Sequence, residues 1–332
     1  MTDAPPLRAK SPTDLLALVP SLLGFHPEES VVVLTVGEAL TPFHARVDLP
    51  TDPVGVEQLA DHLADVARRN RSSRVAVVVY SDDAGLAEAL VARLHRGLWA
   101  GKVDLVCAVR ADGERWWYVD GRGADAEGTP YDVRSHPWTA QSVLDGTVVL
   151  GSRQELADSL VGNDPDETEL IADLADDLAD RLAGPSGSAG GRQALVVEGR
   201  WVRRRVQGFL ADAERLDAQD VARLCTAMTV SLEVRDVAWA EMTRENAARH
   251  VELWRDAVRR CPPELRAAPA ALLGFAAWLA GNGALAWCAV DRAQEAEPGY
   301  GLAGLLTQAL AGAVPPSAWR PFPRDSLTLF AG

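Results

Sequence analysis

Short apolar runs alternate with stretches of helical periodicity over the first third of the chain. The β-branched run 31–36 and the run 43–49 predict two strands of a hairpin, and the valine-rich run 74–80 predicts a third strand. Two further strands are expected at 103–109 and 115–119, joined by a tight Asp-Gly turn. The apolar pattern therefore predicts a sheet in this part of the chain.

Two helices are predicted between these strands. Apolar residues fall on one helical face after Thr51-Asp52-Pro53 and again after Ser81-Asp82-Asp83, and both triplets offer capping side chains. The element order is then strand, strand, helix, strand, helix, strand, strand. Parallel neighbours need a helical crossover while hairpins pair antiparallel, so this order predicts an α/β fold with a mixed β-sheet and packed helices.

A helix is expected before the first strand as well. Ser11 is a capping residue, Pro12 suits the first helical position, and Asp14 places a carboxylate near the positive end of the helix dipole. Gly24 is expected to end that helix, and the segment 25–27 (Phe-His-Pro) then turns the chain into the first strand.

From about Gly121 the pattern changes to loops and helices. Short helices are expected after Trp138 and at Ser152, where a Glu three residues later completes a capping box. The Gly/Ser-rich stretch 184–191 predicts a mobile linker. The other helices are expected at 164–181, 193–216, 218–232, 245–260, 270–280, 284–296 and 302–311.

The pattern predicts three segments. These are an α/β domain with a mixed sheet over 1–163, an acidic helix and linker over 164–192, and a largely α-helical domain packed on the first over 193–332. Residues 283–298 resemble the second helix of a tetratricopeptide hairpin. Such arrays usually need three repeats and no second copy is evident, so tetratricopeptide-like hairpins are expected and a full solenoid is not.

One segment is long and apolar enough to raise the question of a membrane span. Residues 267–290 carry no charge over 24 positions. Pro269, Gly274 and the Gly-Asn-Gly break at 281–283 interrupt the run. Two short helices folded on each other in a buried core explain it better, so no membrane partner is expected.

Composition and charge then narrow the function classes. The 332 residues are 48% hydrophobic and 24% charged, values typical of a globular protein. The formal net charge of -14 repels phosphate backbones and anionic lipids. The basic run 200–205 is expected to pair with the acidic positions of 173–180, so no nucleic-acid partner is predicted.

The four cysteines are widely separated and form no C-x-x-C pair, so the sequence predicts no metal site. The first six residues have neither a basic region nor an apolar core, so no export signal is expected. A cytoplasmic location with reduced thiols follows as the expectation. No cofactor is identified from the sequence.

The best candidate site lies on the second predicted strand. His44, Arg46 and Asp48 alternate with apolar residues and therefore share one face. Together with His26 in the preceding loop, they would bind a small polar or anionic ligand, with a bidentate grip from Arg46 and a histidine that titrates near neutrality. The alternative is a strand face on which Arg46 and Asp48 pair with each other in solvent.

Three further residues complete the candidate ligand-binding set. Trp117 and its neighbour Trp116 point to opposite faces of a strand, so one is expected in the core and the other at a pocket wall. Gly128 and Thr129 come from the glycine-rich loop that follows. The chain contains no Ser-His-Asp motif, no G-x-S-x-G elbow, no H-E-x-x-H helix and no G-x-G-x-x-G turn, so catalytic residues stay unassigned.

Two partial motifs do not meet their requirements. Residues 97–102 are one position short of a phosphate-binding G-x-x-x-x-G-K loop and precede a strand where a helix is needed. The acids at 120, 125 and 127 miss the spacing of a calcium-binding loop.

Several blocks of the chain resemble the actinobacterial family described as domain of unknown function 4192. The resemblance spans nearly the whole chain but implies no activity. In that family many members carry cysteines after the Trp-Trp strand, where this chain has 120–126 without cysteine, so a thiol or metal role there is not implied. The blocks are Leu22-Leu23-Gly24-Phe25-His26-Pro27, Ala45-Arg46-Val47-Asp48-Leu49-Pro50, Arg115-Trp116-Trp117, Glu127-Gly128-Thr129-Pro130, Pro298-Gly299-Tyr300 and Pro315-Pro316-Ser317-Ala318-Trp319.

Two function hypotheses follow. The first is a non-catalytic protein whose sheet binds a small ligand or whose helical tail binds a protein partner. The alternative is a small-molecule enzyme of the hydrolase or transferase class, with His26 as general base, Arg46 and Asp48 beside it, and the 128–130 loop closing the pocket. An enzyme requires these elements around one concave space, whereas a binding protein does not.

Overall fold

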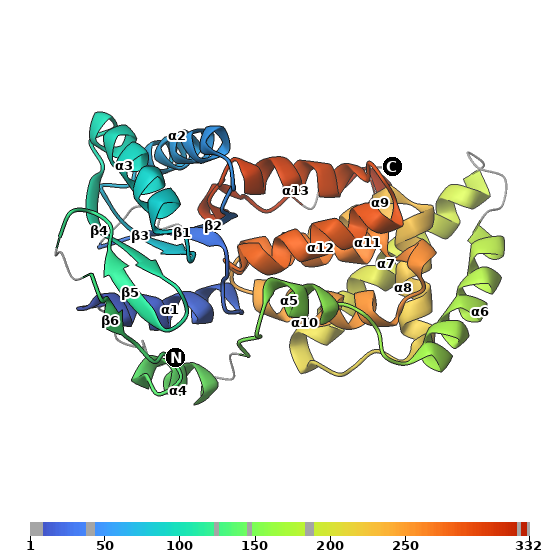
Figure 1. Ribbon diagram of the computed structural model, residues 1–332. Coiled ribbons are helices and arrows are strands. Elements are labelled where there is room, and N and C mark those ends of the chain that lie inside the picture. Colours follow the sequence, from blue (N-terminus) through green and yellow to red (C-terminus); the bar gives the residue numbers. More distant parts are fainter. Residues whose placement is uncertain are drawn as a thin grey trace. The chain divides into compact units, whose positions relative to one another are not determined.

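The computed structural model describes residues 9–37, 44–122, 126–144, 148–182, 189–323 and 327–330 (Figure 1). The chain divides into two compact units. The first contains Met1–Glu155 and Gly312–Pro315, and the second contains Leu156–Ala311 and Pro316–Gly332. The boundaries expected at 163 and 192 stay a prediction.

The first unit contains one mixed sheet, as the sequence predicted. Strands β3 and β4 pair in parallel, and every other neighbouring pair is antiparallel. The order across the sheet is β2-β1-β3-β4-β5-β6. The strands are β1 (Ser30–Thr35), β2 (His44–Asp48), β3 (Arg74–Tyr80), β4 (Asp104–Ala111), β5 (Arg115–Tyr118) and β6 (Thr129–Pro130).

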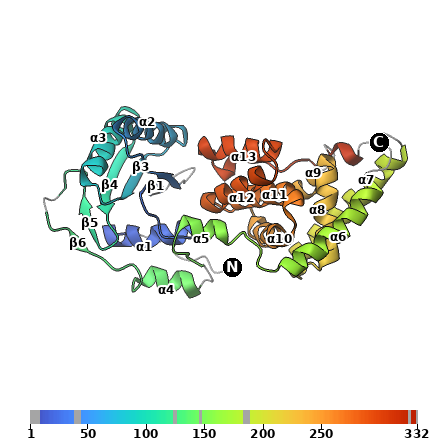
Figure 2. The same cartoon turned by 45° about the vertical axis from the view of Figure 1, so that its right-hand side comes forward.

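Helices cover both faces of this sheet (Figures 1 and 2). The predicted helices α2 (Pro53–Arg69) and α3 (Ala84–Ala100) lie on one face, and their N-termini are capped by the side chains of Asp52 and Asp83. Valines of β1 and β3 pack beneath them with Leu63 and Leu90 in one buried core. Burial of each large aliphatic side chain contributes about 1.5–3 kcal/mol.

The opening helix α1 (Pro12–Leu23) lies on the other face, and its predicted limits are confirmed. Ser11 and Asp14 form a reciprocal capping box, and Gly24 ends the helix with φ +81°. Asp14 also contacts His136, just before α4 (Pro137–Leu144), with 3.1 Å between Oδ1 and Nε2. This contact ties α4 to the start of α1.

The second unit is helical throughout its described residues, apart from loops. Figure 2 shows the hairpin of α11 and α12 beside α13. The helices along this part of the chain are α5 (Arg153–Asp158), α6 (Pro165–Leu182), α7 (Ala189–Asp212), α8 (Ala218–Val230), α9 (Leu232–Trp239), α10 (Ala247–Arg260), α11 (Ala267–Leu279), α12 (Gly283–Ala296) and α13 (Gly301–Ala311), with short 3-10 turns at Pro263–Leu265, Pro316–Ala318 and Thr328–Phe330.

The uncharged segment forms two helices, as predicted. Every residue of α11 is buried, and the chain reverses at Gly281, with φ +81°, before α12 packs against it. Across the described residues, no helix has both the length and the apolar character that a membrane crossing requires.

The structure differs from the sequence prediction at three places. Strand β6 falls within the predicted loop, where Thr129 pairs with Trp116. A separate helix α9 follows α8, because Ser231 adopts an extended conformation (φ -141°) and caps a new helix. Residues 189–191 of the expected linker are the first turn of α7, while 184–188 lie outside the described residues.

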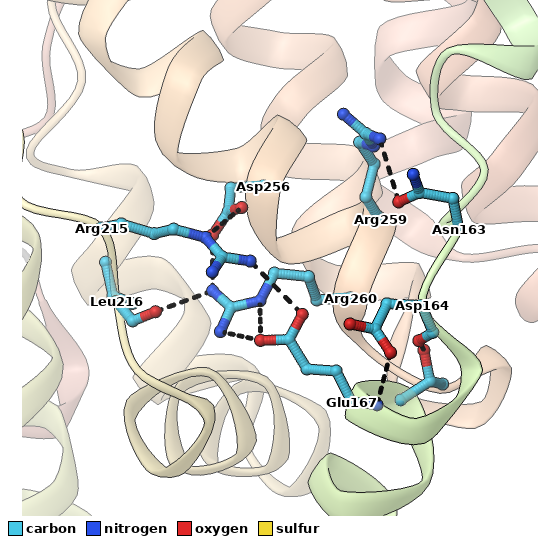
Figure 3. Close-up of polar contacts among 9 residues, drawn as sticks. Asn163, Asp164, Glu167, Arg215, Leu216, Asp256, Arg259 and Arg260 are labelled. Atoms are coloured by element: carbon cyan, nitrogen blue, oxygen red, sulfur yellow. Dashed lines mark hydrogen bonds and ion pairs between the residues drawn. The ribbon is translucent and has the colours of Figure 1, made fainter.

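A buried ion network joins three segments of the second unit (Figure 3). The side chain of Arg260, at the end of α10, is 6% exposed. It donates to Oε1 of Glu167 on α6 at 2.7 Å, to Oδ2 of Asp256 at 2.6 Å, and to the Leu216 carbonyl before α8 at 2.8 Å. Arg215 reaches the same two carboxylates at 3.3 Å, but its side chain is 64% exposed. Arg260 is therefore the residue on which the network depends.

Replacement of Arg260 should test this assignment. Arg260→Gln leaves two carboxylates without their buried partner and should lower the free energy of unfolding by about 3 kcal/mol. The matched exposed change Arg215→Gln should cost less than about 1 kcal/mol. Urea denaturation followed by circular dichroism measures both, and equal losses would contradict a buried anchor.

A buried histidine holds the α9–α10 connection. His250 Nε2 lies 3.3 Å from the Glu241 carbonyl oxygen, and Nδ1 accepts from the Trp254 indole at 3.2 Å. Both contacts fit a neutral imidazole, because Nδ1 must be unprotonated to accept. Burial is the main cause that lowers the pKa of His250 to about 4, against an opposing hydrogen bond to Glu241.

The histidine should make the stability of the protein pH-dependent. Its pKa is about 6.5 in an unfolded chain, so protonation favours unfolding as the pH falls from 6.5 towards 4. This group should remove about 3 kcal/mol over that range and nothing above it. Urea titrations at pH 7.5, 6.0 and 5.0 should show a flatter profile for His250→Gln than for wild type. The exposed change His62→Gln should leave the profile unaltered.

Candidate functional site

A pocket of about 950 Å³ opens at one end of the sheet in the first unit. Its wall is built from four loop segments that lie far apart in the sequence. They are 26–29, 80–82, 111–114 and 131–134, together with Leu16, Pro20 and Gly151.

The sheet register explains why these segments meet. Ser30 pairs with Tyr80, and Tyr80 pairs with Ala111, so β1 begins where β3 and β4 end. The carboxyl ends of parallel strands are the usual location of ligand sites in open α/β sheets. Loops from three adjacent strands therefore converge on one concavity.

The 26–29 loop is held by backbone hydrogen bonds on both sides. His26 N donates to Leu150 O at 3.0 Å, and Leu49 N donates to Glu29 O at 2.9 Å. Glu29 adopts φ +36°, in the left-handed region that non-glycine residues rarely occupy. Such strain costs on the order of 1 kcal/mol and is typical of functional sites.

Ser81 connects the loops through its side chain and backbone. Its hydroxyl donates to Oε2 of Glu29 at 3.0 Å and accepts from Asp83 N at 3.2 Å. Its carbonyl accepts from Nη1 of the buried Arg110 at 3.0 Å, and Asp82 O lies 3.4 Å from the same nitrogen. The geometry of the pocket edge therefore depends on Arg110.

Tyr80 lines the pocket and has a buried, unpaired hydroxyl. The residue is 8% exposed. Among the described residues its hydroxyl has no hydrogen-bond partner. Burial, with a smaller effect of Tyr131, raises the pKa of Tyr80 well above its ordinary value, so the hydroxyl stays protonated. A protonated phenol both donates and accepts a hydrogen bond.

Charge in the pocket is mainly negative. Six carboxylates line it, against the single guanidinium of Arg134. Burial and the charge of Arg134 lower the pKa of His26, which favours its neutral form near pH 7. The imidazole therefore offers hydrogen bonds without adding positive charge.

The predicted polar stripe lies at the edge of the sheet. Ala45 and Val47 pack against the core under α2 and α3, so the predicted alternation is confirmed. Arg46 Nη1 contacts Asp48 at 2.5 Å, and the side chain of Asp48 is 79% exposed. This is the self-pairing that the sequence left open as the alternative. His44, across from Leu34 in the register, does not line the pocket.

Arg46 nevertheless supports the 26–29 loop of the pocket wall without lining the pocket. Its side chain is 12% exposed, and its guanidinium lies 5.8 Å from the centre of the Phe25 ring. Nη2 donates to the Glu28 carbonyl at 3.4 Å. Arg46 thus positions the loop that carries His26, the one predicted residue that lines the pocket itself.

Trp117 and Gly128 form a second support. The Arg110 guanidinium stacks on the Trp117 ring, 3.8 Å from its centre. A Cβ on Gly128 would lie 2.3 Å from Cε2 of that ring, and Gly128 has φ +70°. Thr129 pairs with Trp116, the buried tryptophan of the predicted pair. Trp117, with Gly128 packed against it, therefore acts on the pocket through Arg110.

Sequence reasoning missed the residues that end β3 and β4. Tyr80 appeared only as the last residue of a strand, and the Ser81–Asp83 triplet only as a helix cap. Arg110 was not identified as a site residue, because the predicted strand ended at 109 and β4 in fact continues to Ala111. The available signal was their position at the carboxyl ends of strands predicted to flank a crossover helix. Within the described ranges, no cluster of three or more His, Cys, Asp or Glu side chains could hold a metal ion.

Comparisons with known proteins identify a family whose function is unknown. The model of the family described as domain of unknown function (DUF4192) matches residues 12–317. No curated protein and no solved structure matches the chain significantly. The match covers the whole described pocket.

The Gly128 contact should be testable by a matched pair of alanine variants. Gly121 also has a positive φ (+82°), but the described atoms leave open space around it. Gly121→Ala should therefore cost about 1 kcal/mol in unfolding free energy from backbone conformation alone. Gly128→Ala should cost about 2 kcal/mol more, because Trp117 must move. Equal costs in urea denaturation would rule out the close approach.

Proposed function

The chain belongs to the DUF4192 family, whose description names no activity, so we propose a function from the pocket: the first unit binds a small polar molecule without converting it. The ligand would lie at the ends of β1, β3 and β4. The proposal keeps the expected cytoplasmic location, where thiols such as Cys225 and Cys261 stay reduced.

The unpaired hydroxyl of Tyr80 carries this proposal. Buried polar groups in folded proteins are almost always hydrogen-bonded, and one left unpaired costs about 1–3 kcal/mol. Tyr80 lines the pocket, and its buried hydroxyl lacks a partner among the described residues. A ligand with one donor or acceptor would supply the missing bond and recover that free energy.

The size of the pocket supports a small molecule as the ligand. Sites for small molecules and cofactors usually enclose about 300–1,000 Å³ and combine apolar walls with a few placed polar groups. Leu16, Pro20 and Val133 are apolar parts of this wall, while Tyr80 and His26 provide uncharged polar groups.

The dispersion of the predicted enzyme residues supports binding over catalysis. A hydrolase or transferase mechanism on the predicted set needs His26, Arg46, Asp48 and the 128–130 loop around one space. Of these, His26 lines the pocket, and Asp48 is a solvent-exposed partner of Arg46. The hypothesis of a protein partner at the helical tail stays a prediction.

Replacement of Tyr80 by phenylalanine should have opposite effects on the free and the bound protein. Without ligand, Tyr80→Phe removes an unpaired buried hydroxyl and should raise the free energy of unfolding by about 1 kcal/mol. In a thermal-shift screen of amines, amino acids, sugars, sugar phosphates and nucleotides, a ligand at 100 times its Kd should stabilise wild type by about 2.7 kcal/mol. The variant should gain about 1 kcal/mol less from that compound.

Tyr118→Phe is the matched control, since it removes a tyrosine hydroxyl from β5 outside the pocket lining. It should leave the gain from the ligand unchanged. The proposal fails if no compound stabilises wild type, or if the two variants respond alike.

A further inference from the structure

Three of the six residues that bring carboxylates to the pocket have side chains that make no hydrogen bond to the described part of the chain. The side chains of Glu28, Asp82 and Glu114 make no hydrogen bond within the described part of the chain. Each comes from a different place in the sheet. Glu28 precedes β1, Asp82 follows β3, and Glu114 lies in the turn between β4 and β5.

The other three carboxylates of the wall are partly occupied. Glu29 accepts from Ser81, Asp112 accepts from the backbone N–H groups of 114 and 115, and Asp132 accepts from the backbone N–H of Arg134. These bonds fix the loops but leave the negative charges in place. With Arg134 as the one basic side chain of permanent charge in the lining, the concavity carries a strong excess of negative charge.

This inference rests on the proposed function and names the ligand class: we propose that the pocket binds a small organic cation with an ammonium or guanidinium group. Such groups are pure hydrogen-bond donors, with three or five N–H bonds. They match a wall of unoccupied carboxylate oxygens and a tyrosine hydroxyl that can accept. Clefts lined by charge of one sign concentrate counter-charged ligands and disfavour anions.

The same features favour an organic cation over a bare metal ion. The described residues contain no metal-ligating cluster of three or more side chains. The volume of about 950 Å³ is far larger than a metal ion requires. Tyr80 and Tyr131 add aromatic rings to the wall, and aromatic faces attract organic cations as well as apolar groups.

Isothermal titration calorimetry on the full chain can test this directly. Agmatine, spermidine and L-arginine are the cationic probes, and citrate and glucose 6-phosphate are the anionic ones. At least one cation should bind, and its Kd should rise at least about fivefold between 50 and 500 mM NaCl because salt screens exposed charges. Neither anion should bind.

Charge-neutral variants distinguish binding in the pocket from a non-specific attraction of cations to an acidic protein. Glu28→Gln, Asp82→Asn and Glu114→Gln should each weaken binding by about twofold to fivefold, the range for an exposed ion pair. Glu88→Gln removes an equal charge from the exposed surface of α3, outside the pocket, and should leave the Kd unchanged. A Kd that responds equally to all four changes would overturn the inference.

The outcome also distinguishes this inference from the proposed function. Binding of an anionic probe that is weakened by Tyr80→Phe, with no binding of any cation, would overturn the cationic class and leave the binding function intact. If neither these probes nor the compounds of the thermal-shift screen bind, both proposals fail.

Discussion

The parallel pairing of β3 with β4 is the constraint on which the first unit depends. A parallel pair cannot be joined by a hairpin, so the chain must cross over through α3, and that helix buries one face of both strands. The pairing also brings two carboxyl ends to the same edge. Because β1 runs antiparallel to β3, its amino end lies there too, with Ser30 opposite Tyr80. The parallel pairing of β3 with β4 thus determines both the core of the first unit and the position of the pocket.

Three features at that edge bear on the pocket. Glu29 has a left-handed backbone, Tyr80 has an unpaired hydroxyl, and six carboxylates line one pocket. The valines of β3, a few residues away, are fully buried and pair with β1 and β4. Proteins usually depart from local rules at functional sites. The pocket at this end of the sheet, with the strained Glu29 and the unpaired Tyr80 among its lining residues, is the physical reason to propose the function there.

Much of the fold was predictable from the sequence because its signals are local. The capping box at Ser11, the glycine at 24 and the limits of β3 each depend on residues a few positions apart. Helix α9 was missed because the predicted helix 218–232 was ended near Ser231 and the stretch that follows it was left unassigned, although Ser231 caps a new helix there. Strand β6 was missed because its two residues are paired only through contact with β5, which no local pattern encodes.

The site was predictable only in part, because the sequence does not show which polar residues line the pocket and which support it. Residues were chosen for their chemistry, and chemistry alone does not distinguish a side chain that faces a ligand from one that holds the facing residue in place. Arg46 and Trp117 are of the second kind: one binds the carbonyl of Glu28, and the other stacks on Arg110 behind Ser81. Tyr80 lines the pocket, yet as the last residue of a valine-rich strand it has the sequence context of a core residue. Whether a residue lines the pocket or supports it depends on where its strand ends relative to the neighbouring strands. The register between the strands of the folded sheet determines this, and the sequence does not show it.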